Sequence, residues 1–253
     1  MSIVVKIDEA KFPNLSRGKF EDRKYEFKGG IIGQRVEIKP RGKRSKKAKL
    51  LNVIERSDIE KGLPCPHFEK CGGCTYQTLK YEDELNYKKE LIEKLFVENG
   101  IERELEIIPS PVHKFYRNKM EYTFGDEYKD GPIALGLHVK NRFHEIVNTT
   151  ECNIVDFDFN KIRSQVRNYF EKIGEKHYNR KTHEGFLRHL LIRKATRTSE
   201  IMVLLATSTQ SELDRDAFVK FLLGLDLEGK IVSIFHVKND SLSDAIVPEE
   251  INL

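Results

Sequence analysis

Residues 64–77 read PCPHFEKCGGCTYQ and hold three of the four cysteines in this 253-residue chain. These three are Cys65, Cys71 and Cys74, and the fourth, Cys152, lies far downstream in NTTECNIVD. Thiols this close together in a loop of Gly, Pro and charged residues are poorly suited to a packed core. We therefore expect the three to bind a metal-containing group, with Cys152 brought in by the fold as the fourth ligand.

The spacing of these cysteines is C-x5-C-x2-C followed by one remote cysteine. Structural zinc usually takes two short pairs, and this loop contains one. A 4Fe–4S cluster takes one thiolate at each iron and accommodates three clustered ligands and one distant ligand. The spacing argues against a radical S-adenosylmethionine motif, whose first two cysteines are closer together, but leaves the cluster, zinc and unligated thiols or disulfides open. Gly72 and Gly73 are expected to supply a ligand turn whose backbone can take positive φ and present N–H groups to sulfur.

Positive charge is concentrated at the start of the chain. The formal net charge is +4, and residues 1–57 contain 16 Lys and Arg against 7 Asp and Glu, a balance of +9 that leaves −5 for residues 58–253. Such an asymmetry predicts a module that binds a polyanion, joined to a part with another role.

The basic part is predicted to be a small all-β barrel. Short alternating runs are separated by turns rich in Gly and Lys, and Gly29, Gly30 and Gly33 allow a tight bend before one of the strands. Residues 39–49, KPRGKRSKKAK, hold seven Lys and Arg in eleven positions. This segment is either a solubilising hairpin tip or a phosphate-binding loop on an oligonucleotide-binding barrel. The candidate RNA contacts in it are Arg41, Lys43, Arg44, Lys46 and Lys47.

The remaining chain is predicted to form an α+β domain with a mixed, largely antiparallel sheet. A helix is expected over 81–98, ending at Asn99-Gly100, and a capping box, Thr209-x-x-Glu212, is expected to open a later helix. The expected strands are 115–124, 131–140, 141–150, 186–196, 200–207 and 230–239, and the further helices are 158–173 and 210–224.

Further candidate RNA contacts lie outside the basic loop. Arg117 and Lys119 occupy a strand-like stretch, where ordinary solvent-facing polarity is the alternative to RNA contact. Arg193 alternates with apolar neighbours, so a buried or interdomain ion pair competes with RNA contact. Four aromatic residues of the barrel are expected either to stack on unpaired bases or to pack in the core. They are Phe12, Phe20, Tyr25 and Phe27.

Several classes of protein are disfavoured by the sequence. No apolar run approaches the length needed to span a bilayer. The N-terminus lacks the basic start, long apolar centre and cleavage site of a signal peptide. We therefore expect a cytoplasmic protein without a membrane partner, in a compartment where thiols stay reduced. No feature indicates an obligate protein partner.

Two resemblances follow from these motifs. Residues 29–55, GGIIGQRVEIKPRGKRSKKAKLLNVIE, are similar to the TRAM domain, a small RNA-binding barrel found in RNA-modifying enzymes. The CGGC loop is followed, in order, by YRNKMEYTF (116–124), LGLHVKNRFHEIVNTTEC (135–152) and LRHLLIRKATRTSEIMVLL (187–205). Together they resemble the bacterial 23S rRNA (uracil-C5)-methyltransferases of the RumA/RlmD type, which carry an iron–sulfur cluster.

This resemblance implies a domain plan and a chemistry. Residues 1–57 correspond to a TRAM-like RNA-binding barrel, and residues 58–253 to an iron–sulfur and central α+β domain. Within the latter, 58–100 form the cluster loop and helix, and 101–253 the sheet-rich part. The family's cluster ligands correspond to the four cysteines named above. Its product is 5-methyluridine in ribosomal RNA, and the methyl donor is S-adenosylmethionine.

Members of this family perform the methyl transfer with a C-terminal domain that binds S-adenosylmethionine, and we expect that domain to have no counterpart in these residues. The reaction needs a cysteine thiolate to attack uracil and a base to remove a proton, but all four cysteines are assigned to the cluster. No Gly-rich strand-to-helix turn suggests a cofactor fold. We therefore expect no catalytic residue in this chain and no methyl transfer by it alone. The alternative is a stand-alone RNA-binding protein with an iron–sulfur or zinc centre.

Overall fold

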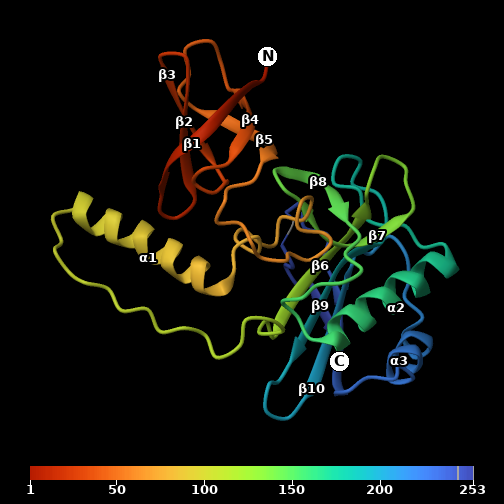
Figure 1. Ribbon diagram of the computed structural model, residues 1–253. Helices are drawn as coiled ribbons and strands as arrows, with labels where there is room; N and C mark the ends of the chain where they lie inside the picture. The colour runs from red at the N-terminus through yellow and green to blue at the C-terminus, as the bar shows by residue number, and fades with distance from the viewer. Residues whose placement is uncertain (244, 253) are drawn as a thin grey trace. The chain divides into compact units, whose positions relative to one another are not determined.

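The computed structural model describes residues 1–243 and 245–252, and Figure 1 labels its three helices and the strands β1 to β10. Contacts within the chain divide it into two compact units. The first comprises Met1–Pro64 and Cys74–Pro111, and the second comprises Cys65–Gly73 and Val112–Leu253. No helix in the described ranges is long and apolar enough to cross a membrane.

The first unit contains a five-stranded antiparallel sheet in the order β3-β2-β1-β4-β5. Its strands are β1 (Ile3–Lys11), β2 (Leu15–Phe20), β3 (Arg23–Lys28), β4 (Arg35–Pro40) and β5 (Ala48–Glu55). The two edges of this sheet approach each other where β3 meets the residues just before β5. Here Glu26 N donates to Lys46 O at 2.8 Å, beside a bridge between Glu26 and Lys47. The predicted small barrel is thus confirmed, in the form of a strongly curled half-barrel.

The barrel core follows the period-two pattern of its strands. Val5 and Ile7 of β1 point inward, whereas the side chain between them, Lys6, is exposed. They pack with Phe27, Val36 and other apolar residues from the neighbouring strands. Alternation of this kind buries one face of each strand, which is why the sequence pattern identified the strands.

The bend before β4 depends on glycine, as the sequence indicated. Gly29, Gly30 and Gly33 have φ of 89°, 87° and 88°, in the left-handed region. At Gly30 a Cβ atom would also lie 2.4 Å from Ile7 Cδ1. A larger residue at this position would therefore be strained and would collide with the barrel core.

Helix α1 (Tyr81–Glu98) has the predicted bounds and packs within the first unit. Its Tyr87 and Leu91 join a core cluster with Ala10 and Ile31 of the barrel region. The Tyr87 hydroxyl also accepts a hydrogen bond from Ile32 N at 3.3 Å. The sequence analysis grouped this helix with the cysteine loop, because its apolar stripe showed that it packs but not on which surface.

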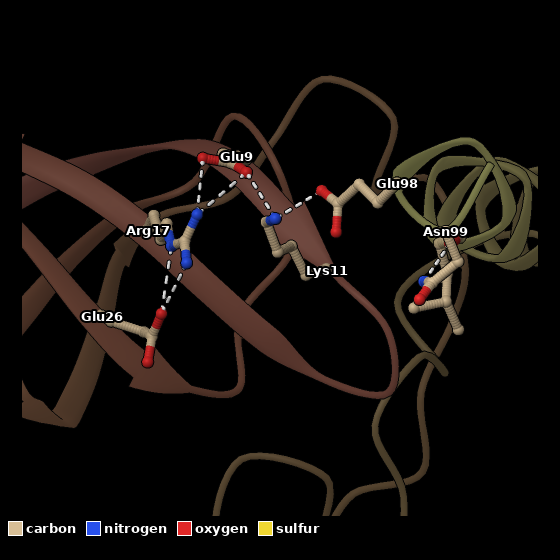
Figure 2. A network of polar contacts seen from close by, with 7 residues as sticks. Glu9, Lys11, Arg17, Glu26, Glu98 and Asn99 are labelled. Atoms are coloured by element: carbon tan, nitrogen blue, oxygen red, sulfur yellow. Dashed lines mark hydrogen bonds and ion pairs between the residues drawn. The ribbon is translucent and has the colours of Figure 1, made fainter.

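A chain of ion pairs runs across three barrel strands to the end of α1 (Figure 2). Arg17 Nη2 donates to Glu26 Oε2 at 2.9 Å, and Arg17 Nη1 donates to Glu9 Oε1 at 3.3 Å. Lys11 Nζ lies 3.7 Å from Glu9 Oε1 and also pairs with Glu98 of the helix. The hydrogen bond that Arg17 donates to Glu26, together with the negative charges of Glu9 and Glu26, raises the pKa of Arg17. This network fixes α1 against strand β1.

The second unit is built on a seven-stranded sheet in the order β12-β11-β10-β9-β6-β7-β8. Its pairs are antiparallel except for β10 and β11, which run parallel and are connected through helix α3. The sheet is therefore mixed, as the predicted α+β class requires. Its elements are β6 (Lys119–Asp126), β7 (Ile133–Val139), β8 (Arg142–Val147), α2 (Phe157–Ile173), β9 (Leu187–Lys194), β10 (Glu200–Thr207), α3 (Arg215–Leu223), β11 (Lys230–Lys238) and β12 (Glu250–Asn252).

Aromatic side chains link the two helices of this unit to its sheet. Phe124 of β6 meets Phe170 of α2 edge-on, with ring centroids 5.8 Å apart. Phe170 in turn lies 5.4 Å from Phe218 of α3. All three side chains are buried, so this cluster forms the centre of the core.

The predicted start of α3 was wrong. The helix begins at Arg215, and its cap is Asp214, whose side chain accepts from Ala217 N at 3.0 Å. Thr209, the expected cap, is instead bonded to Asp240 through both its backbone N and its hydroxyl. A tertiary contact thus takes the hydroxyl that the capping box would have used.

A buried ion-pair cluster connects α2 to β9. Lys194 Nζ lies 2.8 Å from Asp156 Oδ1 and 2.8 Å from Asp158 Oδ2. Asp158 is only 2% exposed and also accepts from Glu228 N and Gly229 N, at 2.9 and 2.8 Å. Burial opposes the charge of Asp158, but these hydrogen bonds and Lys194 outweigh it and lower the pKa of Asp158. Lys194, with two carboxylates, has a raised pKa despite its partial burial.

Candidate metal centre and nucleic-acid surface

The loop Cys65–Gly73 is held against the sheet of the second unit. Cys71 forms an antiparallel bridge with Val139 at the end of β7. Gly72 N donates to His138 O at 2.9 Å, and Lys140 N donates to Lys70 O at 2.8 Å. The backbone of β7 and the residue after it therefore fix the direction of the Cys71 side chain.

The two glycines of the loop meet only part of the prediction, because Gly73 presents its N–H to Cys71 Sγ at 3.4 Å but the backbone is not left-handed. Neither Gly72 nor Gly73 has a positive φ. A Cβ atom on Gly72 would lie 3.0 Å from His138 O, and one on Gly73 would lie 3.0 Å from Leu137 Cδ1. A Cβ atom would be crowded at both positions because the loop approaches strand β7 closely, and at Gly73 the crowded neighbour is the end of a flexible side chain.

Cys152 is positioned from the other side by helix α2. Asn160 of α2 accepts from Cys152 N at 2.9 Å and donates its Nδ2 to Cys152 O at 3.1 Å. The backbone N–H groups of Ile154 and Val155 are directed at the Cys152 sulfur and work against the effect of burial, which raises the pKa of the thiol.

His67 joins the two cysteine-bearing segments. Its Nε2 accepts from Thr150 N at 2.9 Å, and the Thr150 hydroxyl lies 2.9 Å from the same nitrogen. Burial, followed by the positive charge of Arg163, lowers the pKa of His67. The neutral ring therefore serves as a hydrogen-bond acceptor that links the loop 65–73 to the segment around Cys152.

Three of the four thiols interact with one another. Burial raises the pKa of Cys71, the N–H of Gly73 opposes this shift, and Cys152 and Cys65 raise the pKa further. Cys65 likewise raises the pKa of Cys152. None of the four cysteines forms a disulfide, so the structure does not contain the disulfide alternative.

Cys74 belongs to the first unit, where Gln77 Nε2 donates to its sulfur at 3.1 Å. It lies three positions after Cys71 along the chain, which limits the distance between the two Cα atoms to about 10 Å. Over the described residues, no group of three or more His, Cys, Asp or Glu side chains has the geometry of a metal site. The assignment of the four cysteines as ligands therefore stays a prediction.

The chemistry of the donor set nevertheless suits a thiolate-bound group. Thiolates are the soft ligands that iron–sulfur clusters and zinc accept. Gly73 N donates to Cys71 Sγ at 3.4 Å, and N–H groups of this kind commonly stabilise the sulfur ligands of such centres. The three thiols of the second unit, with their N–H donors, are what this structure offers to a metal-containing group.

The basic loop lies between β4 and β5, and its backbone is ordered by turns. Arg41 N donates to Lys47 O at 3.0 Å, and Ser45 N donates to Gly42 O at 3.1 Å. Five cationic side chains of this loop are exposed, and among the described residues none of them forms an ion pair. They are Arg41, Lys43, Arg44, Lys46 and Lys47.

Barrel curvature brings further cations to the basic loop. Arg23, at the start of β3, donates to Lys43 O, and Lys24 beside it is exposed. The sequence analysis did not select Arg23 or Lys24, because they lie some twenty residues before the loop. Only the approach of the two sheet edges places them beside it, and no local sequence signal indicates that approach.

The four barrel aromatics divide between the two predicted roles. Tyr25 and Phe27 are buried in the barrel core. Phe12 and Phe20 are 49% and 37% exposed, so their rings remain accessible for stacking. Phe20 is paired with Arg23 across the β2–β3 turn, which places it near the cations just described.

The three candidate cations of the second unit are all exposed. Lys119 of β6 lies directly opposite Arg193 of β9, so these two come together on one face of the sheet. Arg117 lies apart from that pair, in a bridge with Val155 just beyond Cys152. The buried ion pair considered for Arg193 is wrong, because Arg193 is exposed and forms no ion pair within the described part of the chain.

Like charges directly opposite each other on neighbouring strands are unfavourable. Lys119 is partly compensated by Glu121, whose Oε2 lies 3.8 Å from Lys119 Nζ. Arg193 has no such partner among the residues described. The pair of cations would be stabilised by an anion bound between them, which makes this position suited to a phosphate.

The chain is similar to several bacterial proteins described as uncharacterized RNA methyltransferases. One from Caldanaerobacter subterraneus is 42% identical over 255 residues, covering 99% of this chain and 56% of the relative. Relatives from Clostridium acetobutylicum and Clostridium tetani are 39% and 37% identical, cover 97% and 98% of this chain, and are each covered over 55% of their own length. No known protein-family profile matches.

The chain is thus related to RNA methyltransferases, and it spans about half the length of the curated relatives it matches. It also shares its fold with a solved structure, the tRNA (uracil-54, C5)-methyltransferase of Pyrococcus abyssi in complex with S-adenosyl-L-homocysteine. The TM-score is 0.68 at 21% identity, over 98% of this chain and 55% of that one. The likeness confirms the α+β fold, with its N-terminal barrel and mixed sheet.

Proposed function

We propose that this chain is the RNA-binding and cluster-binding part of an S-adenosylmethionine-dependent methyltransferase that forms 5-methyluridine in 23S rRNA. The observation that carries the proposal is the basic loop, with five exposed cations unpaired among the described residues, on a barrel whose relatives are RNA methyltransferases. Free cations at this density attract phosphate groups and hold RNA without reading its sequence. The protein would act in the cytoplasm.

In this proposal RNA contacts both units. The basic loop, with Arg23 and Lys24, grips the phosphate backbone, and Phe12 and Phe20 stack on unpaired bases. In the second unit, Lys119 and Arg193 hold a further phosphate, and Arg117 contributes a cation near Cys152.

The four cysteines hold a 4Fe–4S cluster in this proposal, as the family resemblance implies. The convergence of Cys65, Cys71 and Cys152 and the N–H donors at their sulfurs support it. Forming 5-methyluridine needs no electron transfer, so the cluster would have a structural role in fixing the loop against the sheet. Zinc bound by the same thiolates is the alternative.

The chain supplies no catalytic residue in this proposal. Methyl transfer would require a thiolate nucleophile, a base and a bound S-adenosylmethionine from a C-terminal domain outside these 253 residues. The chain alone is expected to bind RNA and to leave it unmethylated.

Two measurements test the proposal. The anaerobically purified chain should bind a 23S rRNA transcript more tightly than duplex DNA of equal length, and should transfer no labelled methyl group to it. Iron and acid-labile sulfide in equal amounts, with a broad visible absorbance, would support the cluster, whereas a colourless zinc protein would exclude it. Equal affinity for RNA and DNA, or methyl transfer by the chain alone, would contradict the proposed role.

A further inference from the structure

Arg163 of helix α2 is a buried cation for which the proposed function gives no role. Its side chain is only 1% exposed. Its guanidinium donates to Leu135 O at 2.9 Å, to Asn148 Oδ1 at 3.1 Å and to Ser164 Oγ at 2.5 Å. All three acceptors are neutral, and its Nε has no hydrogen-bond partner. Among the described residues, no carboxylate pairs with Arg163.

A buried charge of this kind is costly unless a charge of opposite sign lies nearby. Burial lowers the pKa of Arg163 to about 10, and the groups that counteract this shift are Tyr122 and Cys152. Among the described residues, Tyr122 and Cys152 are therefore the groups whose negative charge would offset this guanidinium, and Cys152 takes on that charge when it binds a metal as a thiolate. Arg163 lies one helical turn after Asn160, the residue that clamps the Cys152 backbone.

A second unpartnered polar group lies at the same place. The Tyr122 hydroxyl is fully buried and has no hydrogen-bond partner. Burial raises the pKa of Tyr122, and Cys152 raises it further while Arg163 opposes the shift, so the three groups interact. Two buried donors without acceptors beside one thiol indicate that an acceptor-rich, negatively charged group belongs there.

A second cation, Lys140, acts on Cys71. Its Nζ donates to Phe68 O at 2.6 Å and lies 3.8 Å from the centroid of the Phe68 ring. Its positive charge acts to lower the pKa of Cys71. The three thiols of the second unit thus have positive charge near Cys71 and near Cys152.

We propose that Arg163 is the buried counter-charge of the cysteine centre, offsetting the net negative charge of the metal group that Cys152 and its partner cysteines bind. This inference rests on the proposed metal centre. Four thiolates carry more negative charge than a zinc ion or an oxidised 4Fe–4S core carries positive charge, so either centre leaves a net anion to be stabilised. Arg163 acts as a positioning and charge-compensating residue and does not ligate the metal.

The test compares four forms of the 253-residue chain, reconstituted anaerobically with iron and sulfide. They are the wild type, Arg163→Met, Arg163→Lys and the control Arg167→Met. Arg167 lies one turn further along α2, and its Nη2 pairs with Glu171 at 2.7 Å, so it already has its own counter-charge. The readouts are iron and sulfide per chain, loss of cluster to a chelator, the reduction potential, and thermal unfolding with and without the cluster.

We expect Arg163→Met to hold the cluster roughly 10- to 100-fold less tightly, which is the usual effect of losing a residue that supports metal ligands. Its remaining cluster should have a more negative reduction potential, because a nearby positive charge favours the added electron. Arg163→Lys should restore most of the retention, and Arg167→Met should match the wild type. Without the cluster, Arg163→Met should be at least as stable as the wild type, because an uncompensated buried cation has been removed.

The possible failures are distinguishable. If the wild type takes up no cluster and, in a parallel loading with zinc alone, no zinc, the proposed metal centre is overturned and this inference with it. If the wild type is loaded and Arg163→Met retains the cluster equally with an unchanged potential, this inference alone is overturned. If Arg163→Met without cluster unfolds where the wild type stays folded, Arg163 is a purely structural residue, and the inference is again overturned.

Discussion

Neutralising the basic loop should weaken RNA binding in a way that can be calculated from the structure. The variant carries Lys43→Gln, Arg44→Gln and Lys46→Gln. These side chains are exposed and make no ion pairs among the described residues. Their loss should therefore leave the free energy of unfolding within about 0.5 kcal/mol of the wild type. A change in RNA affinity can then be assigned to the lost contacts with phosphate.

The expected magnitude follows from counter-ion release. Each phosphate contact contributes about 0.7 to the slope of log K against log salt for a single strand, so three lost contacts lower the slope by roughly 2. At 1 M salt this contribution to the RNA affinity vanishes. At 0.15 M salt the same three contacts raise the RNA affinity roughly 50-fold. The loss of affinity should therefore shrink as salt is raised.

The assay is fluorescence anisotropy of a labelled 23S rRNA fragment at several salt concentrations. A matched control removes the same charge elsewhere in the first unit, with Lys61→Gln, Lys80→Gln and Lys94→Gln. These three lysines are also exposed and make no ion pair within the described residues. If the loop variant and the control variant show the same slope and affinity, the loop contributes only net charge, and its assignment as a phosphate-binding loop is refuted.

Three further predictions concern the second unit. Cys71→Ser should lose iron, sulfide and visible absorbance together and unfold at a lower temperature than the loaded wild type, because metal binding contributes to folding; full cluster content by elemental analysis would contradict this. Phe170→Ala should cost about 3–5 kcal/mol in urea unfolding, because its ring joins both helices to the sheet. Lys194→Met should cost about 3–5 kcal/mol at neutral pH by leaving Asp158 buried without its cation. Because the folded pKa of Asp158 is lowered, its stabilising contribution is present above the unfolded value and is lost as the pH falls through the folded pKa. Unfolding measured from pH 7 downward should therefore show a smaller difference between Lys194→Met and the wild type in acid.

Much of the local structure could be predicted because it depends on local patterns. The bounds of α1 were predicted from the helical spacing of its apolar residues, and α2 was predicted to within one residue. The glycines of the bend before β4 were recognised because positive φ is a property of one residue. The start of α3 was not predicted correctly, because the hydroxyl of Thr209 is hydrogen-bonded to Asp240, which lies far along the chain.

The candidate sites were only partly predictable, because some of their residues come together only through contacts between distant segments. The five cations of the basic loop are contiguous, so composition alone identified them. Arg23 and Lys24 join them only through the approach of the sheet edges. The proposed role of Arg163 was also hidden, because in the sequence it is one charged residue on an amphipathic helix, and only packing shows that it is buried with no carboxylate partner among the described residues.

By itself, the sequence determined which residues are candidates for the chemistry: the four cysteines, the basic segment and the alternating strands are properties of residue type and spacing. Tertiary structure decided which of them meet. It placed α1 with the barrel, brought Cys152 to the loop of Cys65 and Cys71, and put Lys119 opposite Arg193. The physical reason is that strand pairing and burial depend on contacts between segments that are distant in the sequence. A local sequence pattern shows that a surface is buried, but it does not specify which other surface buries it.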